Sequence, residues 1–166
     1  MIYLIGGAAR VGKTTLAKMI LERNKIPFDS TDMLWWAFKE CQPERKWVEG
    51  WENVPDQFFP FLRSYVNHTI KTLPDYVIEG DSFFPSHAAM LMKDFKVKAV
   101  FLGSSNLNLA DIKKYAQHNN WVEHFSQEEQ EKLPKKLMDD SEMFRKESEK
   151  FGMPYFELAN GREEKL

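Results

Sequence analysis

The 166-residue sequence has little cysteine, no long apolar run and no excess of charge of one sign. Its single cysteine, Cys41, excludes an internal disulfide bond and a metal site built from several cysteines, and it is typical of a reducing compartment. No apolar run approaches the roughly 20 residues that a membrane-spanning helix needs, and no secretory leader pattern opens the sequence. We therefore expect a cytoplasmic protein that does not enter membranes.

Basic and acidic residues are nearly balanced, with 23 Lys and Arg against 25 Asp and Glu and a net charge of −2. This balance argues against general electrostatic attraction to nucleic acid or to anionic lipid. A small molecule is the expected partner, with no nucleic acid and no membrane. The length predicts one domain over residues 1–166, present as a monomer or a homodimer.

What the sequence does contain is one complete phosphate-binding motif near its start. Residues 7–14 match the pattern G-x-x-x-x-G-K-[ST] and follow the apolar run at residues 2–5. The glycines allow a tight turn that directs backbone N–H groups inward, and the following helix adds its positive N-terminus, so the loop forms an anion pocket. The residues that we expect to bind a nucleotide here are Gly7, Ala8, Ala9, Arg10, Val11, Gly12, Lys13, Thr14 and Thr15.

Two residues of this motif have an expected chemical role. Lys13 would reach the β- and γ-phosphates of ATP, which makes it a candidate catalytic residue, and Thr14 would offer its hydroxyl group to Mg²⁺. ATP and Mg²⁺ are therefore the expected cofactors. The alternative is a glycine-rich turn from a strand into a helix, with a lysine that is merely solvated.

Apolar runs and turn signals predict five short strands separated by helices. The strands are expected at residues 2–5, at 26–31 with Asp32 at or just past the end, and at 76–79, 97–102 and 155–158. Helices are expected at 14–23, at 33–41, at 56–72 with Pro60 in the first turn, at 87–95 and at 107–118. A short helix from the capping box at Ser126 to Pro134 and a longer one ending at Gly152 complete the prediction.

Short buried strands that alternate with helices predict an α/β fold with a parallel sheet, because parallel neighbours need crossover connections. Ligands of such sheets bind beyond the carboxyl ends of the strands. This rule places the phosphate loop, Asp32, Glu79 and Gly103 along one edge of the sheet. The scattered residues are therefore expected to share a site.

With these motifs the chain resembles P-loop kinases of the nucleoside monophosphate kinase, shikimate kinase and gluconate kinase group, over nearly its whole length. The likeness rests on residues 7–14, Asp32, the sequence Glu79-Gly80-Asp81, the strand at 97–102 and a polar insertion before the last helix. It implies a three-layer P-loop NTPase fold with strand order 2-3-1-4-5. It also implies a helical substrate-binding segment at about 33–73, a lid at about 119–136, and an adenine site at the loop that contains Asn160.

Acidic side chains at the strand ends are the candidates for handling the phosphate acceptor. Asp32 would orient the acceptor hydroxyl group or take its proton, and its alternative is to cap the helix at 33–41. Asp29 is a second candidate for the same role. Glu79 and Asp81 would position substrate or order a metal-bound water, or they are strand-end acids satisfied by backbone N–H groups.

Aromatic residues gather in the segment between the second and third strands, where the resembling kinases bind the acceptor. Trp36 is our candidate for stacking on a substrate, although the segment can equally use its aromatic rings as its own core. Arg45 and Arg63 are the arginines of this segment that could clamp an anionic acceptor, or else they are solvated surface residues.

The lid departs from the pattern of the resembling kinases, which commonly carry paired arginines there. No arginine occurs between Ser64 and Phe144. Lys132, Lys135 and Lys136 would have to substitute as point charges. Arg145, on the next helix, is the remaining candidate for a catalytic guanidinium group, and its alternative is an ion pair on its own helix.

The sequence thus predicts an ATP- and Mg²⁺-dependent phosphotransferase that moves the γ-phosphoryl group to a hydroxyl or phosphate of a small metabolite. Because the lid lacks arginines, the alternative is a nucleotide-binding or sensing protein with little or no kinase activity. A kinase acting on nucleic-acid ends is a third hypothesis, which the acidic balance and the lack of a basic stripe disfavour.

Overall fold

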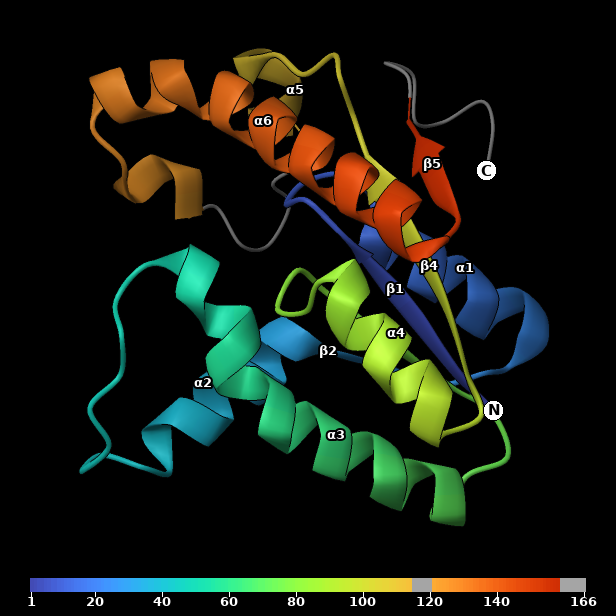
Figure 1. Ribbon diagram of the computed structural model, residues 1–166. Helices are drawn as coiled ribbons and strands as arrows, with labels where there is room; N and C mark the ends of the chain where they lie inside the picture. Colours follow the sequence, from blue (N-terminus) through green and yellow to red (C-terminus); the bar gives the residue numbers. More distant parts are fainter. Residues whose placement is uncertain (115–120, 159–166) are drawn as a thin grey trace.

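The computed structural model describes residues 1–114 and 121–158, which form a five-stranded parallel sheet with helices on both sides (Figure 1). The sheet order is β2-β3-β1-β4-β5, and all four neighbouring pairs are parallel. The strands are β1 Ile2–Gly7, β2 Phe28–Ser30, β3 Tyr76–Glu79, β4 Val97–Gly103 and β5 Tyr155–Glu157. The predicted three-layer fold and strand order are confirmed.

Helices connect every pair of consecutive strands. They are α1 Lys13–Asn24, α2 Thr31–Glu40, α3 Val54–Thr72, α4 Pro85–Asp94, α5 Leu109–Lys114 and α6 Gln127–Phe151, with 3₁₀ turns η1 Trp51–Asn53 and η2 Trp121–His124. α1 packs on β1, β2 and β3, and Figure 1 shows α4 and α6 on the opposite side of the sheet. None of the described helices combines the length and the apolar character that crossing a membrane requires.

Among the described residues, the core consists of two apolar clusters. The larger one fills both faces of the sheet, and its fully buried side chains include Phe58, Phe83 and Phe101. A smaller cluster lies where α5, η2 and the first half of α6 meet, and its buried members are Leu107, Ile112, Val122, Leu133 and Leu137. Burial of both clusters supplies the main stabilising free energy. The second cluster ties the predicted lid segment to the rest of the chain.

Two prolines lie inside helices, which corrects two predicted helix boundaries. α3 begins at Val54 with Pro55 in its first turn, so Pro60 lies in the interior of the helix. α6 continues past Pro134. Leu133 and Leu137, on either side of this proline, are both buried in the smaller cluster, and their packing stabilises one continuous helix. Proline removes one backbone hydrogen bond from a helix, and here packing outweighs that loss.

The helix start predicted at Ser126 and the helix end predicted at Gly152 are confirmed, as the two ends of the single helix α6. The hydroxyl group of Ser126 accepts a hydrogen bond from the N–H of Glu129, and the Glu129 carboxylate accepts one from the N–H of Ser126. This reciprocal pair is a capping box. At the other end, Gly152 adopts the left-handed conformation (φ +65°) that ends a helix.

Candidate active site

The phosphate loop joins the end of β1 to the start of α1 by a turn with three positive φ angles. Gly7 has φ +130°, and a Cβ atom there would lie 2.0 Å from the carbonyl oxygen of Leu102 in β4. Arg10 has φ +63° and Gly12 has φ +93°. Only glycine fits at position 7, and the turn brings the loop over the N-terminus of α1, where an anion is favoured.

Lys13 is folded back over this loop. Its side chain is buried, and its ammonium group donates hydrogen bonds to the carbonyl oxygens of Gly7 at 3.1 Å and Ala8 at 2.6 Å. A merely solvated lysine, the alternative reading of the sequence, does not describe this side chain. The loop therefore holds one buried positive charge at the position where phosphates are expected.

Thr14 connects α1 to the end of β3. Its hydroxyl group donates a hydrogen bond of 3.0 Å to Oε1 of Glu79, the last residue of that strand. Glu79 is only 2% exposed, and burial raises the pKa of its carboxyl group, while the nearby Lys13 charge and the Thr14 hydrogen bond oppose the rise. The hydroxyl group predicted to bind Mg²⁺ and a strand-end carboxylate thus lie in direct contact.

Asp81 lies two residues beyond Glu79 and is held beside Asp32. Its Oδ1 atom is buried and has no hydrogen-bond partner among the described residues. Burial raises the pKa of Asp81 to about 8, the charge of Lys13 opposes this rise, and the charge of Asp32 adds to it. Asp32 itself is exposed on the first turn of α2. The sequence predicted that Asp32 and Glu79 lie along one edge of the sheet, and in the structure Asp81 lies there beside Asp32.

The structure also decides which residue caps α2. Ser30, not Asp32, is the N-cap, because its hydroxyl group accepts a hydrogen bond of 3.3 Å from the N–H of Asp32. The Asp32 carboxylate therefore remains available for another partner. Asp29, the second candidate, instead accepts hydrogen bonds from Tyr65 and Tyr76, the latter at 2.9 Å.

Gly80 allows the close approach between the end of β3 and the start of α2. A Cβ atom at this position would lie 1.8 Å from Oγ1 of Thr31, and its φ angle is +152°. Thr31 is completely buried. Because Asp32 follows Thr31 and Asp81 follows Gly80, this contact brings the two acids next to each other.

The donor set fits a Mg²⁺ ion that is held mainly by a nucleotide. No group of three or more Asp, Glu, His or Cys side chains in residues 1–114 and 121–158 could hold a metal ion by itself. Mg²⁺ in nucleotide sites keeps several waters and takes most of its other ligands from phosphates, with one or two protein oxygens. The Thr14 hydroxyl group, which is hydrogen-bonded to the Glu79 carboxylate, would be such an oxygen ligand.

Most of the aromatic residues between β2 and β3 form a core of their own. Neighbouring rings of Trp35, Phe38, Trp47, Phe58 and Phe61 have centroids 4.8 to 6.3 Å apart. Trp36 differs from them because it is 52% exposed on α2. The interpretation that the aromatic rings form the core of this segment is therefore right for these five residues, whereas the Trp36 ring keeps a face open to solvent.

Arg45 and Arg63 each contact a partner other than Asp32, Glu79 and Asp81. The Arg45 guanidinium carbon lies 4.2 Å from the centroid of the Trp47 ring, in the turn that follows α2. Arg63 forms a 2.8 Å ion pair with Asp94, the last residue of α4, at the edge of the sheet where β4 begins. That edge is opposite the phosphate loop, so the position of Arg63 does not favour the predicted contact with substrate.

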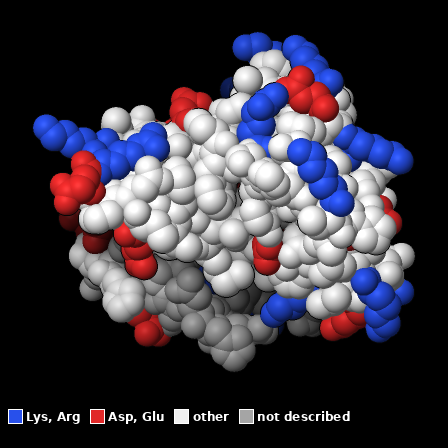
Figure 2. Space-filling view, turned by 90° about the horizontal axis from the view of Figure 1, so that it is seen from below, with Lys and Arg blue, Asp and Glu red and all other residues white. Residues whose placement is uncertain are grey.

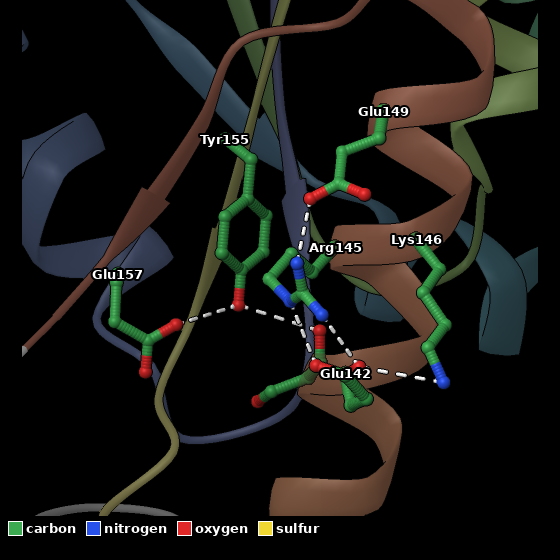
Figure 3. A network of polar contacts seen from close by, with 7 residues as sticks. Glu142, Arg145, Lys146, Glu149, Tyr155 and Glu157 are labelled. Atoms are coloured by element: carbon green, nitrogen blue, oxygen red, sulfur yellow. Dashed lines mark hydrogen bonds and ion pairs between the residues drawn. The ribbon is translucent and has the colours of Figure 1, made fainter.

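Arg145 is bound to carboxylates of its own helix. Figure 3 shows its guanidinium group between Glu142 and Glu149, with hydrogen bonds of 2.6 to 2.7 Å to both. Tyr155 and Glu157 of β5 lie alongside, and the Tyr155 hydroxyl group donates to Glu157 at 3.1 Å. The arrangement corresponds to the helical ion pair that the sequence left open as the alternative to a catalytic arginine.

One contact of the loop escaped sequence reasoning. The guanidinium carbon of Arg10 lies 5.3 Å from the centroid of the Trp121 ring in η2, which begins the described part of the predicted lid. Trp121 also packs edge-on against Phe125. The one signal in the sequence was that Trp121 is the only tryptophan outside residues 35–51.

Charge is dispersed on the face shown in Figure 2. Blue side chains lie mainly in the upper and right parts of this view with red ones among them, the centre is largely uncharged, and no continuous basic area crosses that face. This view agrees with the balance of charges in the sequence. It offers no electrostatic footprint for nucleic acid on that face.

Searches against family models and against curated proteins found no match. Solved structures do match. A sugar kinase from Janibacter sp. HTCC2649 superposes with a TM-score of 0.56 at 12% identity, over 95% of this chain and 83% of that one. A shikimate kinase from Bacteroides thetaiotaomicron superposes with a TM-score of 0.53 at 17% identity, over 93% of this chain and 83% of that one. A gluconokinase from Sinorhizobium meliloti 1021 superposes with a TM-score of 0.52 at 14% identity, over 95% of this chain and 82% of that one.

The chain has the fold of the P-loop small-molecule kinases. Within this kinase fold, the predicted lid is described from Trp121 onward, as η2 and the first turns of α6. Asn160, the residue expected at the adenine site, lies outside the described residues. At these identities the likeness shows the fold alone, and the acceptor must be argued from this chain's own residues.

Proposed function

We propose that the protein is an ATP- and Mg²⁺-dependent phosphotransferase that moves the γ-phosphoryl group of ATP to a hydroxyl or phosphate of a small metabolite. One observation carries the proposal: the buried Lys13 ammonium group, the Thr14 hydroxyl group and the carboxylates of Asp32, Glu79 and Asp81 converge at the carboxyl edge of the sheet. The dispersed charge and the kinase fold support a small-molecule acceptor.

The proposed reaction uses these residues mainly for placement and charge. The loop N–H groups and Lys13 bind the β- and γ-phosphates, and Lys13 leaves its contacts with the loop carbonyl oxygens to do so. Thr14 would hold a Mg²⁺ ion together with the phosphates, and the ion would supply further neutralisation of the phosphate charge. For a hydroxyl acceptor, Asp32 takes the proton of the hydroxyl group. The hydroxyl oxygen forms a bond to the γ-phosphorus while the bond between that phosphorus and the bridging oxygen breaks, which releases ADP.

The buried acids have supporting roles in this proposal. Glu79 orients the Thr14 hydroxyl group through their 3.0 Å hydrogen bond. Asp81 lies beside Asp32 and fixes where that carboxylate points. Neither acid needs to contact the transferred group.

The test is ADP release measured with a panel of nucleoside monophosphates, nucleosides, sugar acids and amino alcohols. One acceptor is expected to raise ATP turnover. Lys13→Ala and Asp32→Asn are each expected to reduce that increase by about 10²- to 10⁴-fold, because each removes charge or proton transfer from the reaction. Glu22→Gln, on the exposed end of α1, is the control and is expected to behave as wild type. Full acceptor-dependent turnover in Asp32→Asn would remove Asp32 from the mechanism.

A nucleotide-binding or sensing protein is the second candidate, favoured by the ion pairs that hold Arg145 and by the absence of arginine from Ser64 to Phe144. It predicts that ATP binds in calorimetry and that no member of the panel is phosphorylated. Robust turnover with one metabolite would exclude it.

A further inference from the structure

The first turns of α2 carry a negative charge and an exposed aromatic ring on one face. Asp32 and Trp36 are four residues apart, so their side chains lie on the same side of the helix one turn apart. Both are exposed, whereas Thr31 and Trp35 are buried. This face begins directly at the carboxyl end of β2, beside Asp81 and the phosphate loop.

The exposed ring already has an ammonium group over it. The Nζ atom of Lys39 lies 5.4 Å from the centroid of the Trp36 ring. That distance is within the range for attraction between a cation and the face of an aromatic ring. Lys39 therefore stands where the ammonium group of a bound molecule could be held.

Three described arginines outside the phosphate loop offer little to an anionic acceptor. Arg45 stacks on Trp47, Arg63 pairs with Asp94 at the opposite edge of the sheet, and Arg145 is bound by two glutamates. Lys13 is assigned to the nucleotide phosphates. Outside the phosphate loop, which carries Lys13 and Arg10, the exposed charge at this edge is the Asp32 carboxylate, which repels an anion and attracts a cation.

We propose that the acceptor is a vicinal amino alcohol, whose ammonium group binds between the Asp32 carboxylate and the Trp36 ring in place of Lys39. The neighbouring hydroxyl group and the ammonium group each contact one oxygen of Asp32, and the hydroxyl oxygen receives the phosphoryl group. The proton of that hydroxyl group passes to Asp32, and ADP leaves. The inference rests on the proposed function and narrows its acceptor to one charge class.

The acceptor class is tested by calorimetry on the full chain with Mg²⁺ and a non-hydrolysable ATP analogue at pH 6.5. Glucosamine, glucose and glucuronate share a ring with hydroxyl groups. Glucosamine is positively charged, glucose is neutral and glucuronate is negatively charged. Amino-propanol, propanediol and lactate repeat the comparison on a second skeleton. In each set the ammonium compound is expected to bind about tenfold more tightly than the neutral one, and the anion least tightly. Tightest binding by the anions, equal binding within both sets, or no binding by either ammonium compound would overturn the proposal.

Lys39→Gln distinguishes ligand binding on this face of α2 from a purely structural role of the helix. Removing the competing ammonium group is expected to tighten binding of the amino alcohol by roughly two- to fivefold, and Trp36→Leu to weaken it by a similar factor. Neither change is expected to alter binding of the neutral analogue. Lys18→Gln, an exposed residue of α1, is the matched control for the loss of one positive charge. Weaker binding of glucuronate in Lys39→Gln, with amino-alcohol binding unchanged, would instead show that Lys39 binds an anion.

The two proposals fail in different ways. If the amino alcohol binds but no ADP is released, the phosphotransferase proposal is wrong and the charge class of the ligand stands. If ADP is released best with an acid or a nucleoside monophosphate, the phosphotransferase proposal stands and the amino-alcohol proposal is wrong.

Discussion

At the scale of single residues, the site is built by placing acids in surroundings that do not favour their charge. Glu79 is buried and Asp81 is half-buried near the carboxyl edge of the sheet, and the loss of contact with water raises the pKa of each carboxyl group. Lys13 is close enough to oppose the rise in both. Removing water from a carboxylate costs free energy that one nearby cation offsets only in part, so both groups keep their protons to a higher pH than an exposed acid does.

The pH dependence of stability follows from the pKa of Asp81. In the folded chain Asp81 keeps its proton up to about pH 8, whereas in the unfolded chain it loses the proton near pH 4. Between these values the folded state binds more protons, so the free energy of unfolding falls as pH rises. Asp81→Asn removes this loss, and it is expected to reduce the fall between pH 5 and pH 8 by on the order of 1 kcal/mol.

This prediction is measured by urea denaturation of both proteins across that pH range, without nucleotide. The control is Asp139→Asn, an exposed residue of α6, which is expected to leave the pH dependence as in wild type. An unchanged slope in Asp81→Asn would show that the carboxyl group titrates alike in the folded and unfolded chains.

Residues with a local pattern could be located from sequence, and those defined by distant partners could not. Lys13 and Thr14 follow from the spacing of one motif, and the acids follow from the rule that ligands bind at the carboxyl ends of parallel strands. Arg63 pairs with Asp94, 31 residues away, and nothing in the sequence around either residue indicates that contact. The catalytic and binding roles of all these residues stay predictions.

At the scale of elements, α6 shows how packing overrides a local signal. The sequence pattern at Pro134 indicates a helix end, and the capping box at Ser126 indicates a start eight residues earlier. The helix instead runs from Gln127 to Phe151, and its first half buries Leu133 and Leu137 in the smaller apolar cluster. Local sequence shows that proline breaks the hydrogen-bond ladder, but not that burial on both sides holds the helix together.

Pro134→Ala is expected to stabilise the protein. It restores a backbone donor to the interior of α6 and removes the clash of the proline ring with the preceding turn, which should raise the free energy of unfolding by about 1–3 kcal/mol. Chemical denaturation measures the change, with Lys135→Ala, the exposed neighbour, as the control for helix propensity. A loss of stability in Pro134→Ala would mean that packing of the proline ring matters more than the backbone hydrogen bond.

At the scale of the whole molecule, the parallel sheet determines where the site can form. β1, β3 and β2 are neighbours and point the same way, so the phosphate loop, Glu79 and the start of α2 meet at one edge, although Gly7 and Glu79 are 72 residues apart in sequence. The fold was predictable because strand order followed from the resemblance that the motif supported. The loop contact between Arg10 and Trp121 was not, because it depends on how η2 packs.

The transfer of the γ-phosphoryl group to a small molecule is the central claim for this protein. Incubation with ATP labelled at the γ-phosphate, Mg²⁺ and the acceptor panel, followed by separation of the labelled products, measures it most directly. We predict that the label appears in one acceptor with wild-type protein and stays in ATP with Lys13→Ala. Label found only in inorganic phosphate, or left in ATP with every acceptor while calorimetry still detects bound nucleotide, would contradict the account.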